Sequence, residues 1–330
     1  MDSLALRTWK DYEDGYSCGL TPGETSVTDA LLLELHRRFP HIAVHRLTPA
    51  NEKRVGADWE WWIGSPAEGW LCLRIQAKRI YDIGYRALDH PGQKDGHYQY
   101  DTLIENCQDP YTLPYHVFYN GWEPTRFGDS PSRRADLRAL RSNPYFPHTD
   151  GARHKLGNIA GPEMIDIGSR MPDWWGCAAL STYQVAALHS LSHDKPKRLY
   201  APRYLSCAMP WSYLFESDTT DQPVGLPRTP GLVDRIHQTL LADTTRSAHA
   251  AQRRYGTRHV QLAEQLDTLQ HDIRNREGRA RRRSQLPPYA AALLARHQGR
   301  NSFEDEFAEQ YQTQPTYTLI TDVSTFDSES

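Results

Sequence analysis

Polar side chains follow a two-residue period in the segment WLCLRIQAK, residues 70–78. Successive side chains of a strand point to opposite faces, so this segment has one apolar face and one polar face. The polar set is Cys72, Arg74, Gln76 and Lys78. An ammonium group beside the interior of a sheet is costly without a counter-charge. The segment therefore predicts a strand in which Lys78 has a carboxylate partner.

The preceding predicted strand, ADWEWWI at residues 57–63, offers two such carboxylates. Asp58 and Glu60 share one face by the two-residue period, so two carboxylates, an amide and an ammonium are expected to converge across neighbouring strands. That combination is expensive to assemble if nothing uses it. The structural alternative is an ion pair between Asp58 and Lys78 at a strand edge.

Six predicted elements position these residues. A helix is expected at 24–39, because ETSVTDALLLELHRRF begins with capping residues and ends before Pro40. Further elements are predicted as strands at 42–47, 57–63 and 70–78, a helix at 98–108 and a strand at 115–119. Trp59 and Trp61 lie on the face opposite Asp58 and are expected in the core. The order of helix, three strands, helix and strand predicts an α/β fold.

The remaining chain is divided by composition. A domain is expected over residues 1–217, with its core near 20–120 and a long insertion at 121–170 that is rich in Gly, Pro, Arg and Ser. Prolines near residue 230 mark a boundary. A C-terminal helical, basic region at 231–300 and an acidic, flexible tail at 301–330 are expected beyond it.

The motifs ETSVTDALLLEL, GADWEWWI, LRIQAKR and VFYN occur in this order and resemble the PD-(D/E)xK nuclease superfamily. They are most similar to the branch of the Mrr-type restriction endonucleases, where glutamine replaces the acid two positions before the lysine. The pattern also resembles a widespread bacterial family of uncharacterised proteins. The resemblance covers about residues 20–120, weakly to 217, and implies a restriction-endonuclease-like core.

The resemblance implies a role for each polar residue. Asp58 is the expected central metal ligand, and Gln76 takes the second ligand or orienting position. Lys78 is expected to position or deprotonate the attacking water. Glu24 matches an acid that some members use for the metal, although an acid near a helix N-terminus is also an ordinary cap. The backbone of Ala77 completes the expected ligand set.

The expected cofactor is Mg²⁺ or Mn²⁺, since a hard cation neutralises charge on the phosphate and lowers the pKa of bound water. The implied activity is phosphodiester hydrolysis, by an endonuclease rather than an exonuclease. Two departures from the superfamily's commonest form stand out: Gln76 replaces an acid, and Ala57 stands where proline is common. Glu60 is the alternative source of the second carboxylate.

The 330-residue chain has a formal charge of -3, which excludes a uniformly cationic nucleic-acid-binding body. Basic residues gather between Arg246 and Arg300, with 12 arginines and 4 acidic residues. Arginine binds backbone phosphates bidentately, although a solvated helix surface or a protein partner explains such a run equally well. The expected nucleic-acid contacts are Arg79, Gln99, Arg281, Arg282 and Arg283. The resemblance favours DNA over RNA.

Five scattered cysteines without a CxxC pair, and no apolar run of transmembrane length, favour a cytoplasmic protein without a membrane partner. The resemblance implies a role in bacterial defence against foreign DNA, with a homodimer or a defence-system protein as further partner. The rival interpretation is a nuclease-like subunit that has lost catalysis and binds nucleic acid or serves as a scaffold.

Overall fold

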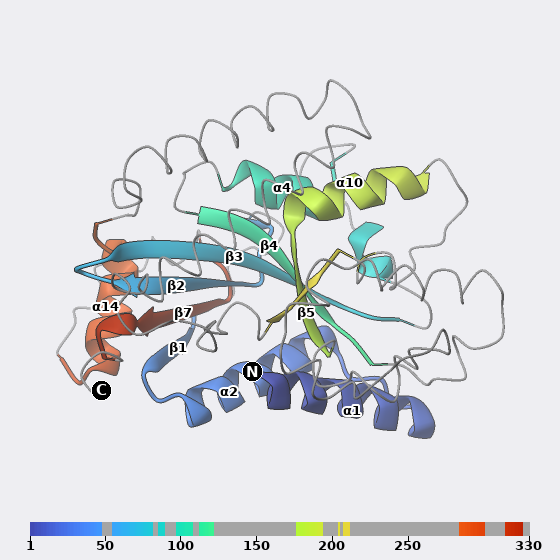
Figure 1. Cartoon of the computed structure of the whole chain (residues 1–330), viewed down its shortest axis with the longest axis horizontal. Helices are drawn as coiled ribbons and strands as arrows, with labels where there is room; N and C mark the ends of the chain where they lie inside the picture. Colours follow the sequence, from blue (N-terminus) through green and yellow to red (C-terminus); the bar gives the residue numbers. More distant parts are fainter. Residues whose placement is uncertain are drawn as a thin grey trace, which may run out of the picture.

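The structure is a computed structural model of the chain. It describes residues 1–47, 55–81, 85–89, 97–107, 112–121, 176–193, 204, 207–211, 284–300 and 314–325. Within these residues a seven-stranded mixed sheet lies between helices on its two faces (Figure 1). The predicted α/β class is confirmed.

The sheet has the strand order β1-β7-β2-β3-β4-β5-β6. Its strands are β1 (Ile42–Arg46), β2 (Trp59–Ser65), β3 (Gly69–Arg79), β4 (Thr112–Tyr119), β5 (Cys177–Ser181), β6 (Met209–Pro210) and β7 (Tyr317–Asp322). Strand β2 is antiparallel to β3 and parallel to β7, and β3 is parallel to β4. The longest strand, β3, therefore lies in the middle of the sheet with partners on both edges.

Helices cover both faces of the sheet. They are α1 (Asp2–Cys18), α2 (Glu24–Arg38), α4 (Gln99–Glu105), α10 (Thr182–His193) and α14 (Pro288–His297), with short 3-10 turns η1 (Arg86–Asp89) and η7 (Val323–Thr325). Apolar side chains of α1 and α2 pack with one face of β2 and β3. Residues of α4 and α10 pack on the opposite face over β4 and β5, and α14 packs there over β1, β2 and β7.

Tryptophans fill the core below the start of β2, as the sequence predicts. Trp59 and Trp61 are almost completely buried. Trp59 stacks on Trp211 with ring centroids 5.1 Å apart. Burying each ring removes a large apolar surface from water, so the start of β2 is held firmly against the body of the protein.

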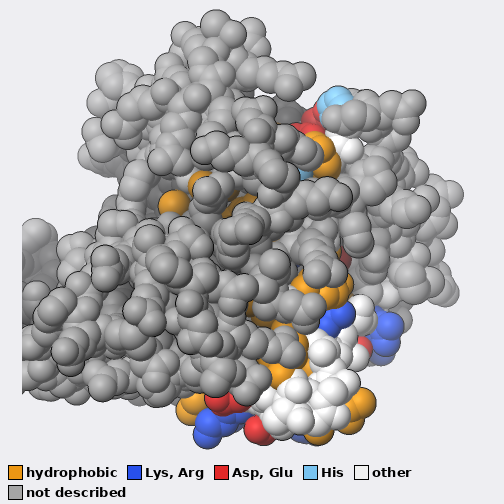
Figure 2. Space-filling view, turned by 90° about the vertical axis from the view of Figure 1, so that its right-hand side faces the viewer, with side chains coloured by type: hydrophobic (Ala, Val, Ile, Leu, Met, Phe, Trp, Pro, Cys, Tyr) orange, Lys and Arg blue, Asp and Glu red, His pale blue; other side chains and the backbone are white. Residues whose placement is uncertain are grey.

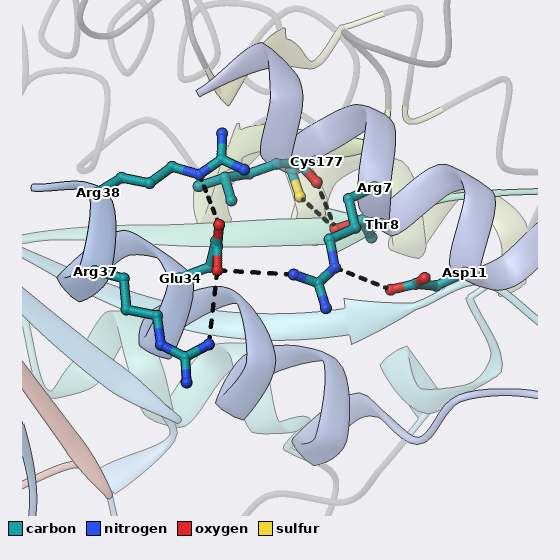
Figure 3. Close-up of polar contacts among 8 residues, drawn as sticks. Arg7, Thr8, Asp11, Glu34, Arg37, Arg38 and Cys177 are labelled. Carbon is teal, nitrogen blue, oxygen red and sulfur yellow. Dashed lines mark hydrogen bonds and ion pairs between the residues drawn. The ribbon is translucent and has the colours of Figure 1, made fainter.

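A solvent-exposed group of salt bridges links α1 to α2 at the lower edge of the molecule. The carboxylate of Glu34 contacts Arg7 of α1 and also Arg37 and Arg38 of its own helix (Figure 3). The hydrogen bond from Arg38, 2.7 Å long, holds the pKa of Glu34 below its usual value. Along the lower edge of the side drawn in Figure 2, the visible described side chains mix basic, acidic and apolar groups.

The C-terminal segment differs from the expectation of a flexible acidic tail. Residues Tyr317–Asp322 form β7, which is buried along its length and inserted between β1 and β2. Helix α14, part of the region expected to form a separate basic unit, packs through Tyr289 and Leu293 on the same sheet. The segment YTLITD carries β-branched and aromatic residues, so its local pattern outweighs the acidic composition around it.

Helix α1 was not anticipated by the element pattern, and the insertion expected at 121–170 lies, except for Gly121, outside the described residues. Of the helices that the structure describes, none combines the length and the apolar character that a membrane span requires.

A chain that ends at residue 313 should lose cooperative folding, because it lacks β7, which is hydrogen-bonded to β1 on one edge and to β2 on the other. Thermal unfolding followed by circular dichroism checks this. A chain that ends at residue 325 keeps β7 and η7 and should melt like the full-length protein. Equal melting of the 313-residue chain would show that β7 is dispensable.

Candidate active site at the end of strand β3

Strand β3 extends beyond the point at which β2 begins. Trp59, the first residue of β2, is paired with Ile75, whereas β3 continues to Arg79. The edge of β3 that faces β2 therefore has two further N–H groups, at Ala77 and Arg79. A buried strand edge without hydrogen-bond acceptors is costly, so these two groups need partners other than a strand.

Two carboxylates supply those partners. Oδ2 of Asp58 accepts a hydrogen bond from the N–H of Ala77 at 2.6 Å. Oε2 of Glu24 accepts one from the N–H of Arg79 at 3.1 Å. Asp58 and Glu24 thus take the place of a neighbouring strand, and they are brought to one end of the sheet from different elements.

Lys78 lies between these two backbone contacts and is almost completely buried. Its Nζ is 3.7 Å from Oε1 of Glu24 and donates a hydrogen bond to Oε1 of Gln99 at 3.3 Å. The predicted carboxylate partner of Lys78 is therefore present, although the ion pair that forms is with Glu24. Gln99 belongs to α4, so four segments meet at this point.

The path of the backbone that leads to Asp58 depends on Gly56. This residue has φ 74°, and a Cβ added to it would lie 2.7 Å from the backbone nitrogen of Leu103 in α4. A side chain would therefore force the segment before Asp58 away from α4. The positive φ and the close approach to α4 explain why glycine stands first in the motif GADWEWW.

Glu24 is positioned by the first turn of α2. The hydroxyl of Thr28 donates to the carbonyl of Glu24 at 3.0 Å and also hydrogen-bonds the hydroxyl of Tyr119 in β4 at 3.0 Å. The pKa of Tyr119 is raised well above its ordinary value, chiefly by burial. A neutral hydroxyl pair thus anchors the helix start to the sheet while Glu24 reaches β3.

A pocket of about 130 Å³ opens beside the two carboxylates. Its lining consists of Glu24, Thr25, Thr28, Arg46, Asp58, Thr316 and Tyr317. These residues come from α2, the end of β1 and the starts of β2 and β7. The pocket gives a ligand access to a group of charges that is otherwise largely enclosed.

Gln76 is completely buried, and neither Oε1 nor Nε2 of its amide has a hydrogen-bond partner among the described residues. Its neighbour in β4 is His116, which is equally buried. His116 shares a hydrogen bond between Nδ1 and the hydroxyl of Thr182 at 3.0 Å. Burial, reinforced by Lys78, keeps the pKa of His116 well below its ordinary value, so the imidazole is neutral at neutral pH.

Glu60 is not brought into this group, which differs from the sequence expectation. Its carboxylate is fully buried and accepts hydrogen bonds from Tyr289 at 2.6 Å and from Thr318 at 3.1 Å, while Arg74 lies 3.9 Å away. Asp58 precedes the first residue of β2 and turns towards β3, so the two-residue period does not extend to it. The structure therefore places the carboxylate of Glu60 with Tyr289, Thr318 and Arg74 rather than with Glu24 and Lys78.

The expected nucleic-acid contacts are only partly described. The guanidinium of Arg79 donates to the carbonyl of Pro22 at 3.1 Å and lies over the ring of Tyr81, 4.1 Å from its centroid. Gln99 binds Lys78, as described above. Arg281, Arg282 and Arg283 lie outside the described residues.

The donor set is compatible with Mg²⁺ or Mn²⁺ but is small. Among the side chains that the structure describes, three or more His, Cys, Asp or Glu residues do not group in a way that could hold a metal ion. Mg²⁺ usually keeps several waters and binds through one or two carboxylates. Asp58 and Glu24 meet that lower requirement, and the unpaired amide of Gln76 is a further candidate oxygen ligand.

Comparison with known families places the chain. A family of unknown function, DUF6615, has a family model that matches residues 1–323. The chain belongs to DUF6615. The DUF6615 match extends from α1 through β7, so it includes Glu24, Asp58 and Lys78 together with the C-terminal strand. No curated protein matches the chain.

The buried contact between Tyr289 and Glu60 gives a pH-dependent prediction for this DUF6615 protein. Burial, with a further contribution from Glu60, raises the pKa of Tyr289 well above 10. The unfolded chain ionises this tyrosine first as the pH rises past about 10. The contribution of Tyr289 to stability is therefore complete below that pH and decreases progressively as the pH rises from there towards the higher pKa of the folded protein.

Replacing Tyr289→Phe should lower the free energy of unfolding by about 1–3 kcal/mol at pH 7, because Glu60 loses a buried donor. The difference from wild type should narrow above pH 10, because only the wild type loses the contribution of Tyr289 there, while the other tyrosines titrate in both proteins. Urea unfolding across pH measures both effects. Tyr81→Phe is the control, and an unchanged free energy at pH 7 for Tyr289→Phe would contradict the role of this contact.

Proposed function

We propose that the protein is a metal-dependent nuclease of the PD-(D/E)xK type that hydrolyses phosphodiester bonds, with DNA preferred over RNA. The observation that carries this proposal is the meeting of Asp58, Glu24 and Lys78 at the end of β3 beside an open pocket. The order α2, β1, β2, β3, α4, β4 supports it, because it matches the core that the sequence motifs imply. In this proposal β7 is an addition to that core.

A purely structural ion pair accounts for less of the geometry. One carboxylate would suffice to neutralise Lys78, whereas two acids are held here within a few residues of it along β3. An unsatisfied buried amide also costs about 1–3 kcal/mol. A ligand that hydrogen-bonds or coordinates the amide of Gln76 would offset this cost, and the need for such a ligand favours a functional site over a purely structural ion pair.

In this proposal the residues at the end of β3 have different roles in metal binding and in hydrolysis. Asp58 and Glu24 would hold Mg²⁺ or Mn²⁺, with Gln76 and the backbone of Ala77 as further oxygen donors. The cation, when bound, neutralises charge on the phosphate and lowers the pKa of a bound water. Lys78 is buried near Glu24, so it would orient the attacking water and stabilise negative charge on the phosphate.

The biological setting is a further part of the proposal and is supported by the motif resemblance alone. It comprises a cytoplasmic role in bacterial defence against foreign DNA, with a homodimer or a defence-system protein as partner. The competing function is a nuclease-like subunit without catalysis. It is favoured by one observation: both acids already have a structural task, because they cap the N–H groups of β3.

Asp58→Asn and Lys78→Met should each reduce cleavage of linear DNA by about 10²–10⁴-fold in Mg²⁺ or Mn²⁺. The asparagine keeps an oxygen acceptor for Ala77 but loses the charge, so the strand end should stay folded. Rates of product formation on gels, with a chelator control and with RNA of the same sequence, provide the measurement. Glu34→Gln, an acid elsewhere on α2, is the matched control and should retain the wild-type rate.

Two results would count against the nuclease. Absence of cleavage by the wild-type protein with either metal would favour the non-catalytic subunit. Equal cleavage by wild type, Asp58→Asn and Lys78→Met would assign the hydrolysis to another site or to a contaminant.

Metal binding has a separate readout that does not require turnover. Mn²⁺ should raise the melting temperature of the wild-type protein, because a ligand that binds only the folded state stabilises it. The increase should be much smaller in Asp58→Asn and in Glu24→Gln, and unchanged in Glu34→Gln. Equal increases in all four proteins would place the metal elsewhere.

A further inference from the structure

The pocket beside the acids has a second wall with a different chemistry. Glu24 and Asp58 form the acidic side, whereas Arg46, Thr25 and Tyr317 contribute a guanidinium, a hydroxyl and an aromatic ring. The proposed reaction uses only the acidic side. The other wall therefore needs an explanation of its own.

The two walls are joined by three neighbouring strand ends. Arg46 is paired with Tyr317 in β1 and β7, and Tyr317 is paired with Trp59, the residue after Asp58, in β7 and β2. Two strand spacings, about 10 Å, separate the backbone of Arg46 from the backbone of Trp59. The sheet thus fixes the backbone of Arg46 relative to the start of β2, which Asp58 precedes.

Tyr317 is held in place from both sides. Its hydroxyl donates a hydrogen bond to Asp29 of α2, and the guanidinium of Arg46 lies over its ring, 5.8 Å from the centroid. The contact with Asp29 fixes the ring between α2 and β1. Arg46 therefore has a rigid support beneath its charged group.

Arg46 itself is exposed, and no carboxylate in the described part of the chain forms an ion pair with it. A guanidinium that is supported by a ring but not neutralised by an acid is suited to bind an anion from solution. Phosphate is the natural match, since its oxygens accept two parallel N–H hydrogen bonds from arginine.

We propose that Arg46, assisted by the hydroxyl of Thr25, binds a backbone phosphate of the nucleic acid close to the bond that is cleaved. This inference rests on the proposed function, because it places the reacting phosphate against Asp58 and Glu24. The pocket then sets the path of the strand across β1, β7 and β2.

A phosphate contact positions a strand without reading its sequence. The contribution of Arg46 should therefore be similar for different base sequences and for DNA and RNA. It should weaken with salt, because binding releases counterions from the polymer.

Binding of a fluorescein-labelled 20-nucleotide DNA strand, its duplex and the equivalent RNA, measured by anisotropy in chelator, tests this without cleavage. Arg46→Ala should raise the dissociation constant about 5–10-fold for all three, with a salt slope lower by about 1. Arg46→Lys keeps a charge and should recover part of the affinity. Arg37→Ala removes an exposed arginine that contacts Glu34 on the same side of the sheet (Figure 3) and should bind like wild type.

With Mn²⁺ present, Arg46→Ala should raise KM and leave kcat nearly unchanged, because Arg46 contacts a phosphate that does not react. Loss of affinity in Arg46→Ala without cleavage by wild type would uphold the phosphate site and refute the nuclease. Wild-type affinity in Arg46→Ala, an equal loss in Arg37→Ala, or no nucleic-acid binding by wild type would each overturn the phosphate site. Melting curves establish that every variant is folded.

Discussion

The candidate site depends on how the end of β3 is closed. This strand continues past the start of β2, and its backbone needs acceptors for the N–H groups of Ala77 and Arg79. The carboxylates of Asp58 and Glu24 provide them. Because carboxylate-to-amide hydrogen bonds are stronger than neutral ones, the same contacts that finish the sheet also fix two negative charges beside Lys78.

The C-terminal strand determines what surrounds that group. β7 separates β1 from β2, and Tyr317 of β7 lines the pocket together with Thr316, the residue before the strand. Strand β7 also provides Thr318, which donates a hydrogen bond to Glu60. Tyr289 of α14 donates a second hydrogen bond to the same carboxylate. Strands from the early and the late part of the chain thus lie side by side in one sheet. The pocket needs both parts, because Thr316 and Tyr317 belong to its lining.

The sequence predicts the central elements well because their signals are local. The helix that begins at Glu24 and the strands β1 to β4 are each indicated by a few neighbouring residues, although the N-cap of this helix is Gly23 and has no side-chain hydrogen bond. The burial of Trp59 and Trp61 follows from strand alternation. The contact of Lys78 with an acid is also predictable from the cost of burying an ammonium, although the partner is Glu24.

Other features depend on contacts distant in sequence or on local bends. Glu60 is hydrogen-bonded to Thr318, which lies 258 residues further along the chain, and no local sequence pattern indicates such a contact. Asp58 sits just before β2, where the alternation of a strand no longer fixes the direction of a side chain. For β7, the acidic composition of its surroundings conceals a short run of strand-forming residues.

The structural task of the two acids does not exclude catalysis; it changes what catalysis would require. A carboxylate that already accepts a backbone hydrogen bond is oriented before any ligand arrives, so little conformational entropy is lost on binding. Each carboxylate has a second oxygen, and for Glu24 that oxygen lies near Lys78. A cation bound between the acids would therefore compete with an ammonium rather than with water. Activity at this site therefore depends on whether a cation binds the carboxylate of Glu24 more strongly than Lys78 does.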